Sequence, residues 1–297
     1  MHLFSYSISK QTLEIHETIP AVKQHLRAFK TQNKAIGLVP TMGALHQGHL
    51  ELIRQSKKQM DVTIVTIFVN PIQFNNPEDL QKYPRTLEAD LAVLSEEGVD
   101  IVFVPSEKEI YPEGIFMEFD FGTMEQVLEG RFRPGHFNGV AIVVSKLFHI
   151  VQPDIAFFGQ KDLQQVSVVK RLVSDLSFGI EIEVVPTVRE TDGLALSSRN
   201  QRLSPEGRKI APLLYKTLTK CKDELLMGGD WLKIKNNAIK KILNPIEINP
   251  EYLELVDEAD FSLVQQPIPG KSYAICIAAY IEQVRLIDNI IFRSGHI

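Results

Sequence analysis

GLVPTMGALHQGHL, residues 37–50, is the stretch from which the fold can be inferred most readily. Its apolar beginning predicts a strand, which ends where a proline, Gly43 and Gly48 interrupt the pattern and a helix begins. His46 and His49 lie three residues apart at this strand-to-helix junction. The free N–H groups and partial positive charge of a helix N-terminus attract phosphate, and imidazoles there can donate hydrogen bonds to it. The stretch therefore predicts a phosphate-binding turn at the edge of an α/β sheet.

Roles other than phosphate binding have less support for His46 and His49. A zinc site would need a third and usually a fourth ligand at suitable spacing, and none is evident in the sequence. The chain contains no GxxxxGK[ST] sequence, and the junction is not GxGxxG, which disfavours a P-loop and a strict dinucleotide-binding fold. The remaining alternative is that both imidazoles only fill the turn.

The composition predicts a globular cytoplasmic protein. The chain has 297 residues, of which 44% are hydrophobic and 23% charged, so it can form one large domain or two moderate ones. The net charge of −5 argues against a broad nucleic-acid surface. The start of the chain lacks the features of a signal peptide, and its apolar runs are too short to span a membrane. We therefore expect neither a nucleic-acid nor a membrane partner.

Two local features of composition have simple structural explanations. The basic stretch KIKNNAIKK, residues 233–241, is typical of the solvent-exposed face of a helix. The only two cysteines, Cys221 and Cys276, fit a reducing compartment, and we expect both to be buried packing residues.

Strands alternate with helices over the first two thirds of the chain. Strands are predicted at residues 35–41, 62–70, 99–105, 154–159 and 179–188, and helices at residues 49–59, 86–98, 137–151 and 162–176. This alternation predicts an α/β fold: a Rossmann-like parallel sheet with helices on both faces. Ligands of such sheets bind beyond the carboxyl ends of the strands.

The alternation stops near Pro186, which predicts a second domain. Helical stretches follow, and then strand-like segments at residues 253–257, 272–281 and 284–292. We predict a catalytic nucleotide-binding domain over residues 1–186 and a smaller α+β domain with short antiparallel strands over residues 187–297.

Two further motifs follow predicted strands and suit phosphate binding. In FFGQKDLQQ, residues 157–165, Lys161 begins a helix and can pair with phosphate, whereas Asp162 can either serve the site or cap that helix. In TDGLALSSRNQRLS, residues 191–204, two hydroxyl groups and Arg199 lie on one loop. The alternative for this second motif is an ordinary loop and cap before the helix that begins near Ser204.

A fourth motif, VNPIQFNNPEDLQKYPRTLEADL, residues 69–91, places neutral polar groups after a buried strand. Asn70, Gln73 and Asn75 are suited to orienting a small molecule because they bring no charge to be neutralised. Glu88 or Asp90 can help to hold Mg²⁺. The alternative for both carboxylates is the solvent-exposed side of a helix. Together the four motifs predict an α/β enzyme that binds a nucleoside triphosphate, and they leave the second substrate open.

The same residues closely resemble the pantoate–β-alanine ligase (pantothenate synthetase) family. PTMGALHQGH is similar to that family's version of the HIGH motif of nucleotidyltransferases and class I aminoacyl-tRNA synthetases, and LSSRN is similar to their KMSKS loop. VNPIQF, YPRT, EGRFRPGHFNGV, FGQKDLQQ and DGLALSSRN also resemble blocks of this family, in the expected order from Pro40 to Asn200.

The resemblance implies an activity, its cofactors and an oligomer. ATP, with Mg²⁺, and pantoate would give an enzyme-bound pantoyl adenylate and pyrophosphate, and β-alanine would then convert the adenylate into pantothenate and AMP. A homodimer is implied as well. His49, His46 and Lys161 would be catalytic, Gln73 and Gln165 would bind pantoate, with Gln73 also near β-alanine, and Asp90 would contribute to Mg²⁺ binding. The ATP-binding residues would be Met42, Gly43, Ala44, Leu45, His46, Gln47, Gly48, His49, Gly159, Gln160, Lys161, Asp162, Val188, Leu196, Ser197, Ser198 and Arg199, the last five closing over ATP from the second domain.

Single features of the sequence disfavour three other functions. An adenylyltransferase acting on another small, phosphorylated acceptor would favour Arg or Lys where Gln73 and Gln165 stand. A non-catalytic nucleotide-binding protein would have no need of His46, His49 and Lys161 together. A tRNA synthetase is disfavoured by the acidic balance and by the lack of an obvious anticodon-binding extension.

Overall fold

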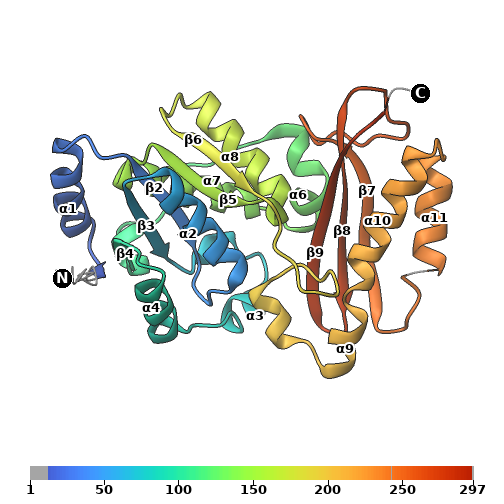
Figure 1. Cartoon of the computed structure of the whole chain (residues 1–297), viewed down its shortest axis with the longest axis horizontal. Helices are drawn as coiled ribbons and strands as arrows, with labels where there is room; N and C mark the ends of the chain where they lie inside the picture. The colour runs from blue at the N-terminus through green and yellow to red at the C-terminus, as the bar shows by residue number, and fades with distance from the viewer. Residues whose placement is uncertain (1–12, 242, 296–297) are drawn as a thin grey trace, which may run out of the picture.

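The computed structural model describes residues 13–241 and 243–295, and its larger part is a six-stranded parallel sheet (Figure 1). The first twelve residues, on which most of the signal-peptide prediction rests, lie outside these described residues. The strand order is β1-β4-β3-β2-β5-β6. The strands are β1 (Glu14–His16), β2 (Ile36–Thr41), β3 (Val62–Ile67), β4 (Ile101–Phe103), β5 (Ile155–Gly159) and β6 (Glu181–Val185).

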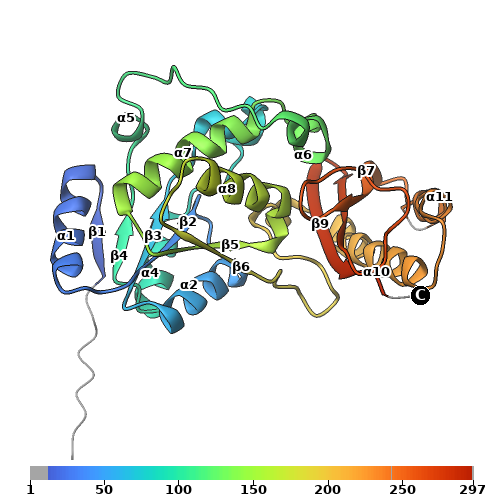
Figure 2. The same ribbon diagram turned by 90° about the horizontal axis from the view of Figure 1, so that it is seen from above.

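Helices cover both faces of this sheet (Figure 2). On one face lie α7 (His136–Val151) and α8 (Leu163–Asp175), with α1 (Ile19–Thr31) packed beside α7. On the other face lie α2 (Gln47–Gln59) and α4 (Leu87–Glu96). A parallel sheet needs apolar cover on both faces, and these helices provide it. The predicted Rossmann-like fold is thereby confirmed.

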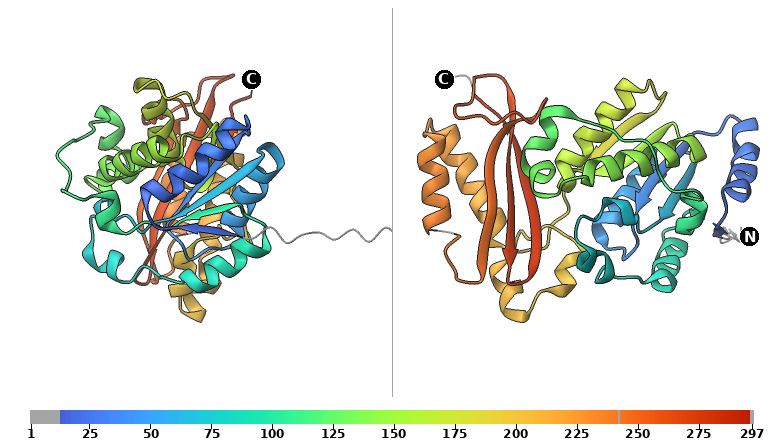
Figure 3. Two further views of the ribbon diagram at one scale, coloured as in Figure 1. Left: turned by 90° about the vertical axis from the view of Figure 1, so that its left-hand side faces the viewer. Right: turned by 180° about the vertical axis from the view of Figure 1, so that it is seen from behind.

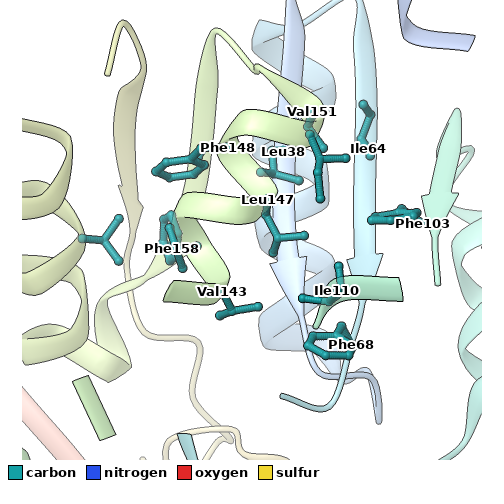
Figure 4. Packing of buried hydrophobic residues seen from close by; sticks show 14 of the residues in the cluster. Leu38, Ile64, Phe68, Phe103, Ile110, Val143, Leu147, Phe148, Val151 and Phe158 are labelled. Carbon is teal, nitrogen blue, oxygen red and sulfur yellow. The ribbon is translucent and has the colours of Figure 1, made fainter. Parts of the chain in front are cut away.

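The core between α7 and the sheet explains why α7 forms despite its β-branched residues. Its helical spacing places Val143, Leu147 and Val151 together against Leu38 of β2 and Ile64 of β3 (Figure 4). All five side chains are buried. Tertiary burial of this apolar stripe outweighs the weak helix propensity of valine and isoleucine.

Several elements were absent from the sequence-based prediction. They are the edge strand β1, helix α1 and the short helices α3 (Pro77–Gln81), α5 (Glu107–Ile110) and α6 (Leu128–Phe132). Four 3₁₀ turns, η1 (Pro71–Gln73), η2 (Gly122–Gln126), η3 (Gln160–Asp162) and η4 (Ser198–Arg202), were missed as well. Most of these pieces are too short to show a hydrophobic period.

The C-terminal part is an antiparallel sheet of order β7-β8-β9 with helices on one side (Figure 3). Its elements are α9 (Pro205–Ile210), α10 (Leu213–Leu226), α11 (Trp231–Lys241), β7 (Ile248–Asp257), β8 (Ser272–Ile281) and β9 (Val284–Arg293). Each strand has ten residues: β8 and β9 match the predicted segments at residues 272–281 and 284–292 to within one residue, whereas β7 begins five residues before the predicted segment at residues 253–257.

The length of these strands follows from burial on both faces. Along β8, Tyr273, Ile275 and Ile277 pack under α10 and α11, whereas Ala274 and Cys276 pack towards α6 and the start of α8. Figure 3 shows α6 on the side of the sheet opposite α10 and α11. The C-terminal sheet is therefore fixed directly beside the edge of the larger sheet at which β5 ends and α8 begins.

Further predictions concerned the cysteines, the basic stretch and membrane-spanning helices. Cys221 and Cys276 are buried and unpaired, as predicted, and the lysines of residues 233–241 lie on α11 with Lys233 and Lys240 exposed. Among the described residues, no helix combines the length and the hydropathy that crossing a membrane requires. The domain boundary stays a prediction; β6, the last strand of the larger sheet, ends at Val185, just before it.

Candidate active site

A cavity lies where the strand order of the parallel sheet reverses. From β2 the chain continues outwards through β3 and β4 on one side, and β5 and β6 occupy the other side. The loops that leave the carboxyl ends of β2 and β5 line the cavity, as expected for a doubly wound sheet. The C-terminal side is closed by residues 186–188 and 196–199 of the segment that connects the two sheets.

The cavity brings most of the predicted site residues together. Those that line it are Met42, His46, Gly48, His49, Gln73, Gly159, Lys161, Asp162, Gln165, Val188, Leu196, Ser197, Ser198 and Arg199. Outside its lining are Gly43, Ala44, Leu45, Gln47, Gln160 and Asp90.

The two histidines form a cap at the start of α2. His46 is the N-cap residue, and its Nδ1 accepts a hydrogen bond of 3.1 Å from the Gly48 backbone N–H. Nδ1 of His49 accepts a bond of 3.3 Å from the His46 backbone N–H, which completes a reciprocal capping box. Because both Nδ1 atoms are acceptors, the single hydrogen of each neutral ring lies on Nε2. Each ring can therefore donate one hydrogen bond to a ligand in the cavity.

The surroundings keep both imidazoles neutral. Burial, reinforced by the nearby Lys161 ammonium, lowers the pKa of His46 to about 4. Burial, followed by the charges of His46 and Lys161, lowers the pKa of His49 to about 3. At neutral pH these side chains therefore act as hydrogen-bond donors, and the positive charge at this end of the cavity comes from Lys161.

Two glycines shape the turn for different reasons. Gly43 has a φ of +78°, and a Cβ there would meet the Asp90 carboxylate at 3.0 Å. A Cβ on Gly48 would lie 2.8 Å from the His46 ring, so the glycine makes room for the imidazole over the helix start. Gly159 differs from both, because a Cβ there would meet no atom within 4 Å. Gly159 lines the cavity, so that open space is available to a ligand.

Asp90 holds the turn after β2. Its two carboxylate oxygens accept hydrogen bonds from the backbone N–H groups of Ala44 and Leu45 at 2.9 and 2.8 Å, and Thr86 Oγ1 donates to it at 3.2 Å. It is only 3% exposed, so the expected solvent-exposed side of the helix is wrong for Asp90, although Glu88 is exposed as expected. The carboxylate is stable when buried because backbone donors satisfy it.

Lys161 is positioned from the C-terminal sheet. The Nδ2 group of Asn289, on β9, donates to the backbone carbonyl oxygens of Gln160 and Lys161 at 3.0 and 2.9 Å. Gln160 Nε2 donates back to Asn289 Oδ1 at 3.2 Å. Beside it, the carboxylate of Asp288 accepts two hydrogen bonds from the Arg189 guanidinium at 2.6 and 2.9 Å. The lysine that faces the cavity therefore depends on residues far along the chain.

The loop of residues 197–199 is held against the first domain. Ser198 Oγ donates a hydrogen bond of 3.0 Å to the Ala44 carbonyl oxygen. The Arg199 guanidinium donates to Asp79 at 2.7 Å, and Arg202 donates to the other oxygen of the same carboxylate at 2.9 Å. Ser204 caps the following helix as expected, since its Oγ accepts from the Gly207 N–H at 2.9 Å.

Both predicted pantoate-binding residues line the cavity. Gln73 is 8% exposed; its Oε1 accepts from Asn70 Nδ2 at 3.0 Å and its Nε2 contacts Met42 Sδ at 3.1 Å. Gln165 lines the cavity, whereas Gln164 is buried and bonds to the backbone of residues 124–129. Asn75 is exposed and does not line the cavity, so its predicted role has no further support.

Arg133 and His136 also line the cavity, and no site role was predicted for them. His136 Nδ1 donates to the Gln73 carbonyl oxygen at 2.9 Å, and the Arg133 guanidinium donates to His136 Nε2 at 3.0 Å. Burial, with the charge of Arg133, lowers the pKa of His136 to about 3. The only sequence signal for these residues was their position inside the block EGRFRPGHFNGV.

A buried ion cluster supports Arg133 from behind. Glu129 accepts two hydrogen bonds from the Arg285 guanidinium at 2.9 and 2.7 Å and one from the Tyr252 hydroxyl at 2.8 Å. Arg133 lies 3.4 Å from the same carboxylate. Burial opposes ionisation of Glu129, but Arg285 and Arg133 outweigh it and lower its pKa to about 2. The cluster therefore joins α6 to β7 and β9 next to the cavity.

Comparison with known proteins identifies the family. The sequence matches the family described as pantoate–β-alanine ligase over residues 14–291. The chain belongs to the pantoate–β-alanine ligase family. Like the other members it is a ligase, and the resemblance first inferred from its motifs is confirmed.

Individual members of the pantoate–β-alanine ligase family are similar over nearly their whole length. Pantothenate synthetase of Cytophaga hutchinsonii is 48% identical over 275 residues, covering 92% of this chain and 97% of the relative. The crystal structure of pantothenate synthetase from Thermus thermophilus matches with a TM-score of 0.86 and 41% identity, covering 93% of this chain and 98% of that one. The pantoate–β-alanine ligase of Francisella tularensis, complexed with β-γ ATP and β-alanine, matches with a TM-score of 0.79 and 38% identity, covering 94% and 98%.

Proposed function

We propose that the chain joins pantoate to β-alanine with ATP, giving pantothenate, AMP and pyrophosphate through a bound pantoyl adenylate. One observation carries the catalytic part of this proposal. Two neutral imidazoles with free Nε2–H donors and one ammonium group line the same cavity, at the start of a helix and at the point where the sheet order reverses. This combination is suited to a triphosphate whose negative charge shifts during reaction.

The first step is adenylate formation at the α2 end of the cavity. A pantoate carboxylate oxygen attacks the α-phosphorus of ATP, a P–O bond forms, and the bond to pyrophosphate breaks. Negative charge grows on the leaving pyrophosphate, where the Nε2–H groups of His46 and His49 donate and Lys161 supplies positive charge. Fixed donors in a partly dry site need little reorganisation as that charge moves. We assign the nucleotide itself to the open face at Gly159.

Pantoate is assigned to the Gln73 end of the cavity. Gln73 and Gln165 offer neutral amide groups, and Val143, Val144 and Leu147 add apolar wall around them. A branched, hydroxylated carboxylic acid needs this mixture of apolar surface and a few placed polar groups. The apolar wall also helps to exclude water from the mixed anhydride.

The second step needs a site for β-alanine. Its amine attacks the acyl carbon, a C–N bond forms, the C–O bond to AMP breaks, and the amine loses a proton. Its own carboxylate requires a cation, and we assign this role to Arg133, which lines the cavity next to Gln73 through His136.

The residues present fit Mg²⁺ only as a companion of ATP. Asp162 is the sole carboxylate among the described residues that line the cavity, and its side chain is half exposed. Asp90 already accepts three hydrogen bonds and lies outside the lining, so its predicted role in Mg²⁺ binding has no further support. Mg²⁺ usually takes one or two carboxylates together with phosphates and water, which suits Asp162 as the single protein ligand. When bound, the ion would neutralise part of the phosphate charge.

Three further predictions belong to this proposal. The chain acts as a homodimer, it works in the cytoplasm, and it consists of a catalytic domain at residues 1–186 and a smaller domain at residues 187–297. The change from a parallel to an antiparallel sheet after Val185 supports that division. A molar-mass measurement in solution tests the dimer directly.

Pyrophosphate release tests the proposed reaction. The protein is supplied with ATP and Mg²⁺, and with pantoate alone, β-alanine alone, or both, while AMP is measured in parallel. Sustained release with both acids, with AMP formed in step, is the expected result. Turnover with neither acid despite ATP binding would contradict the substrate assignment and favour an adenylyltransferase acting on another acceptor.

A further inference from the structure

A group of metal-ligating side chains lies at the outer edge of the large sheet, outside the catalytic cavity. Glu14, His16 and His25 place one ligand atom each so that all three atoms lie within 4.8 Å of one another. Across the described residues, no second group of three such side chains meets this criterion. None of the three lines the cavity.

The fold brings these residues together from two elements. Glu14 and His16 are two positions apart on β1, so their side chains project from the same face of the strand. His25 comes from α1, which follows β1 directly, and its ring stacks on Phe29 one turn later with centroids 5.2 Å apart. Figure 2 shows β1 and α1 at the end of the molecule opposite the C-terminal sheet. The imidazole of His25 is therefore held in place by packing.

The two imidazoles already have nearly the separation that a shared ion requires. His16 Nε2 and His25 Nδ1 lie 3.0 Å apart. Two nitrogen ligands at about 2.0 Å from a tetrahedral ion are about 3.3 Å apart, so the rings would have to separate by only a few tenths of an ångström. Replacing the hydrogen between the two nitrogens by a cation is therefore geometrically easy.

We propose that Glu14, His16 and His25 bind a divalent transition-metal ion of the Zn²⁺ type. Two imidazoles and one carboxylate are a ligand set that such ions prefer, and because the group is only partly buried, water can occupy the fourth position. The ion would join β1 to α1 and stabilise this edge of the sheet. It has no part in the ligase reaction, because β1 lies three strand spacings from β2, about 14 Å away.

Metal binding by untagged, chelator-treated protein tests the proposal. Zn²⁺ is titrated by calorimetry, and Co²⁺ is added separately to record its visible absorption. The wild-type protein is expected to bind one Zn²⁺ that His16→Ala and His25→Ala do not bind, and to show a Co²⁺ band that both variants lack. Glu14→Gln is expected to weaken Zn²⁺ binding about tenfold or more. Mutating a residue that only supports a metal ligand already lowers affinity by about that factor, so replacing a ligand should cost no less.

His149→Ala is the matched control. His149 is exposed and also lies against a phenylalanine ring, Phe178, with centroids 5.1 Å apart, but no other histidine among the described residues pairs with it. This variant should keep full Zn²⁺ binding, and every variant should keep the wild-type ligase rate in the presence of ATP and Mg²⁺ without added Zn²⁺. Because all these proteins retain His46 and His49, ions bound in the cavity cancel in the comparison. The proposal is overturned if the wild-type protein binds no Zn²⁺, or if His25→Ala and Glu14→Gln bind it as tightly as the wild type does.

Discussion

Asn289 is the residue through which the C-terminal sheet fixes Lys161, and replacing it by alanine tests that connection. The side chain is 3% exposed and takes part in three hydrogen bonds with residues 160–161. Asn289→Ala removes all three bonds and leaves two carbonyl oxygens without their donor. The backbone that carries Lys161 is then no longer fixed from that side.

Asn289→Ala should lower both the stability of the protein and the rate of the reaction. At about 1 kcal/mol of net stability for each hydrogen bond, the variant should unfold about 3 kcal/mol more easily. A displacement of about 1 Å at a group that stabilises the transition state can reduce the rate about 100-fold. Since Lys161 acts on charge that develops during adenylate formation, kcat should fall much more than the KM for ATP rises.

The assay is pantoate-dependent pyrophosphate release, measured below the melting temperature of the variant. Asn138→Ala is a suitable control, because Asn138 also accepts a partly buried backbone hydrogen bond, from Phe119 at 2.9 Å, but does not line the cavity. The control should lose stability and keep kcat. A folded Asn289→Ala protein with normal kcat would refute the claim that β9 positions Lys161.

Three further predictions follow from the turn and from the buried histidine. Gly48→Ala should reduce kcat about tenfold by displacing the His46 ring, without lowering the melting temperature, because alanine favours the helix by about 1 kcal/mol. Gly159→Val should fold normally and raise the KM for ATP, since its side chain would enter open cavity; an unchanged KM would place the nucleotide elsewhere. His136 has a folded pKa of about 3 against an ordinary value of 6.5, so it stays neutral while the unfolded chain takes up a proton below pH 6.5. Stability should therefore fall as the pH drops below 6.5, with a slope that approaches about 1.4 kcal/mol per pH unit. The free energy of unfolding in urea, measured between pH 7 and pH 5, should depend less on pH for His136→Gln than for the wild type. Equal slopes would show that His136 is not kept neutral by burial in the folded protein.

The elements with a clear hydrophobic pattern, whether periodic or continuous, were predictable from sequence. The run at Val62–Ile67 consists of β-branched residues and is buried along its whole length, so its place in the centre of a parallel sheet follows from composition. The three-residue strand β1 gave no such signal, because it lies at the sheet edge and is mostly exposed. In the C-terminal sheet β8 and β9 were predicted almost to the residue, whereas the first half of β7 was missed because Asn249, Pro250 and Glu251 interrupt its apolar pattern.

The site was predictable where its residues cluster along the chain. His46, His49 and Lys161 follow strands directly, so the topology of the sheet is enough to bring them together. Asn289 is 128 positions from Lys161, and no local pattern marks such a pair. Asp90 was misjudged for the same reason, since the backbone donors that satisfy its charge belong to a turn 45 positions away.

The most direct test of the central claim is isotope exchange between labelled pyrophosphate and ATP in the absence of β-alanine. The account predicts exchange that requires pantoate, and a loss of at least about 100-fold in His49→Ala, the range seen when one transition-state donor is removed. The variant should stay within about 1 kcal/mol of wild-type stability, because only a cap hydrogen bond is lost. Near-normal exchange by folded His49→Ala protein, or exchange that does not depend on pantoate, would contradict the assignment of this helix start as the site of adenylate formation.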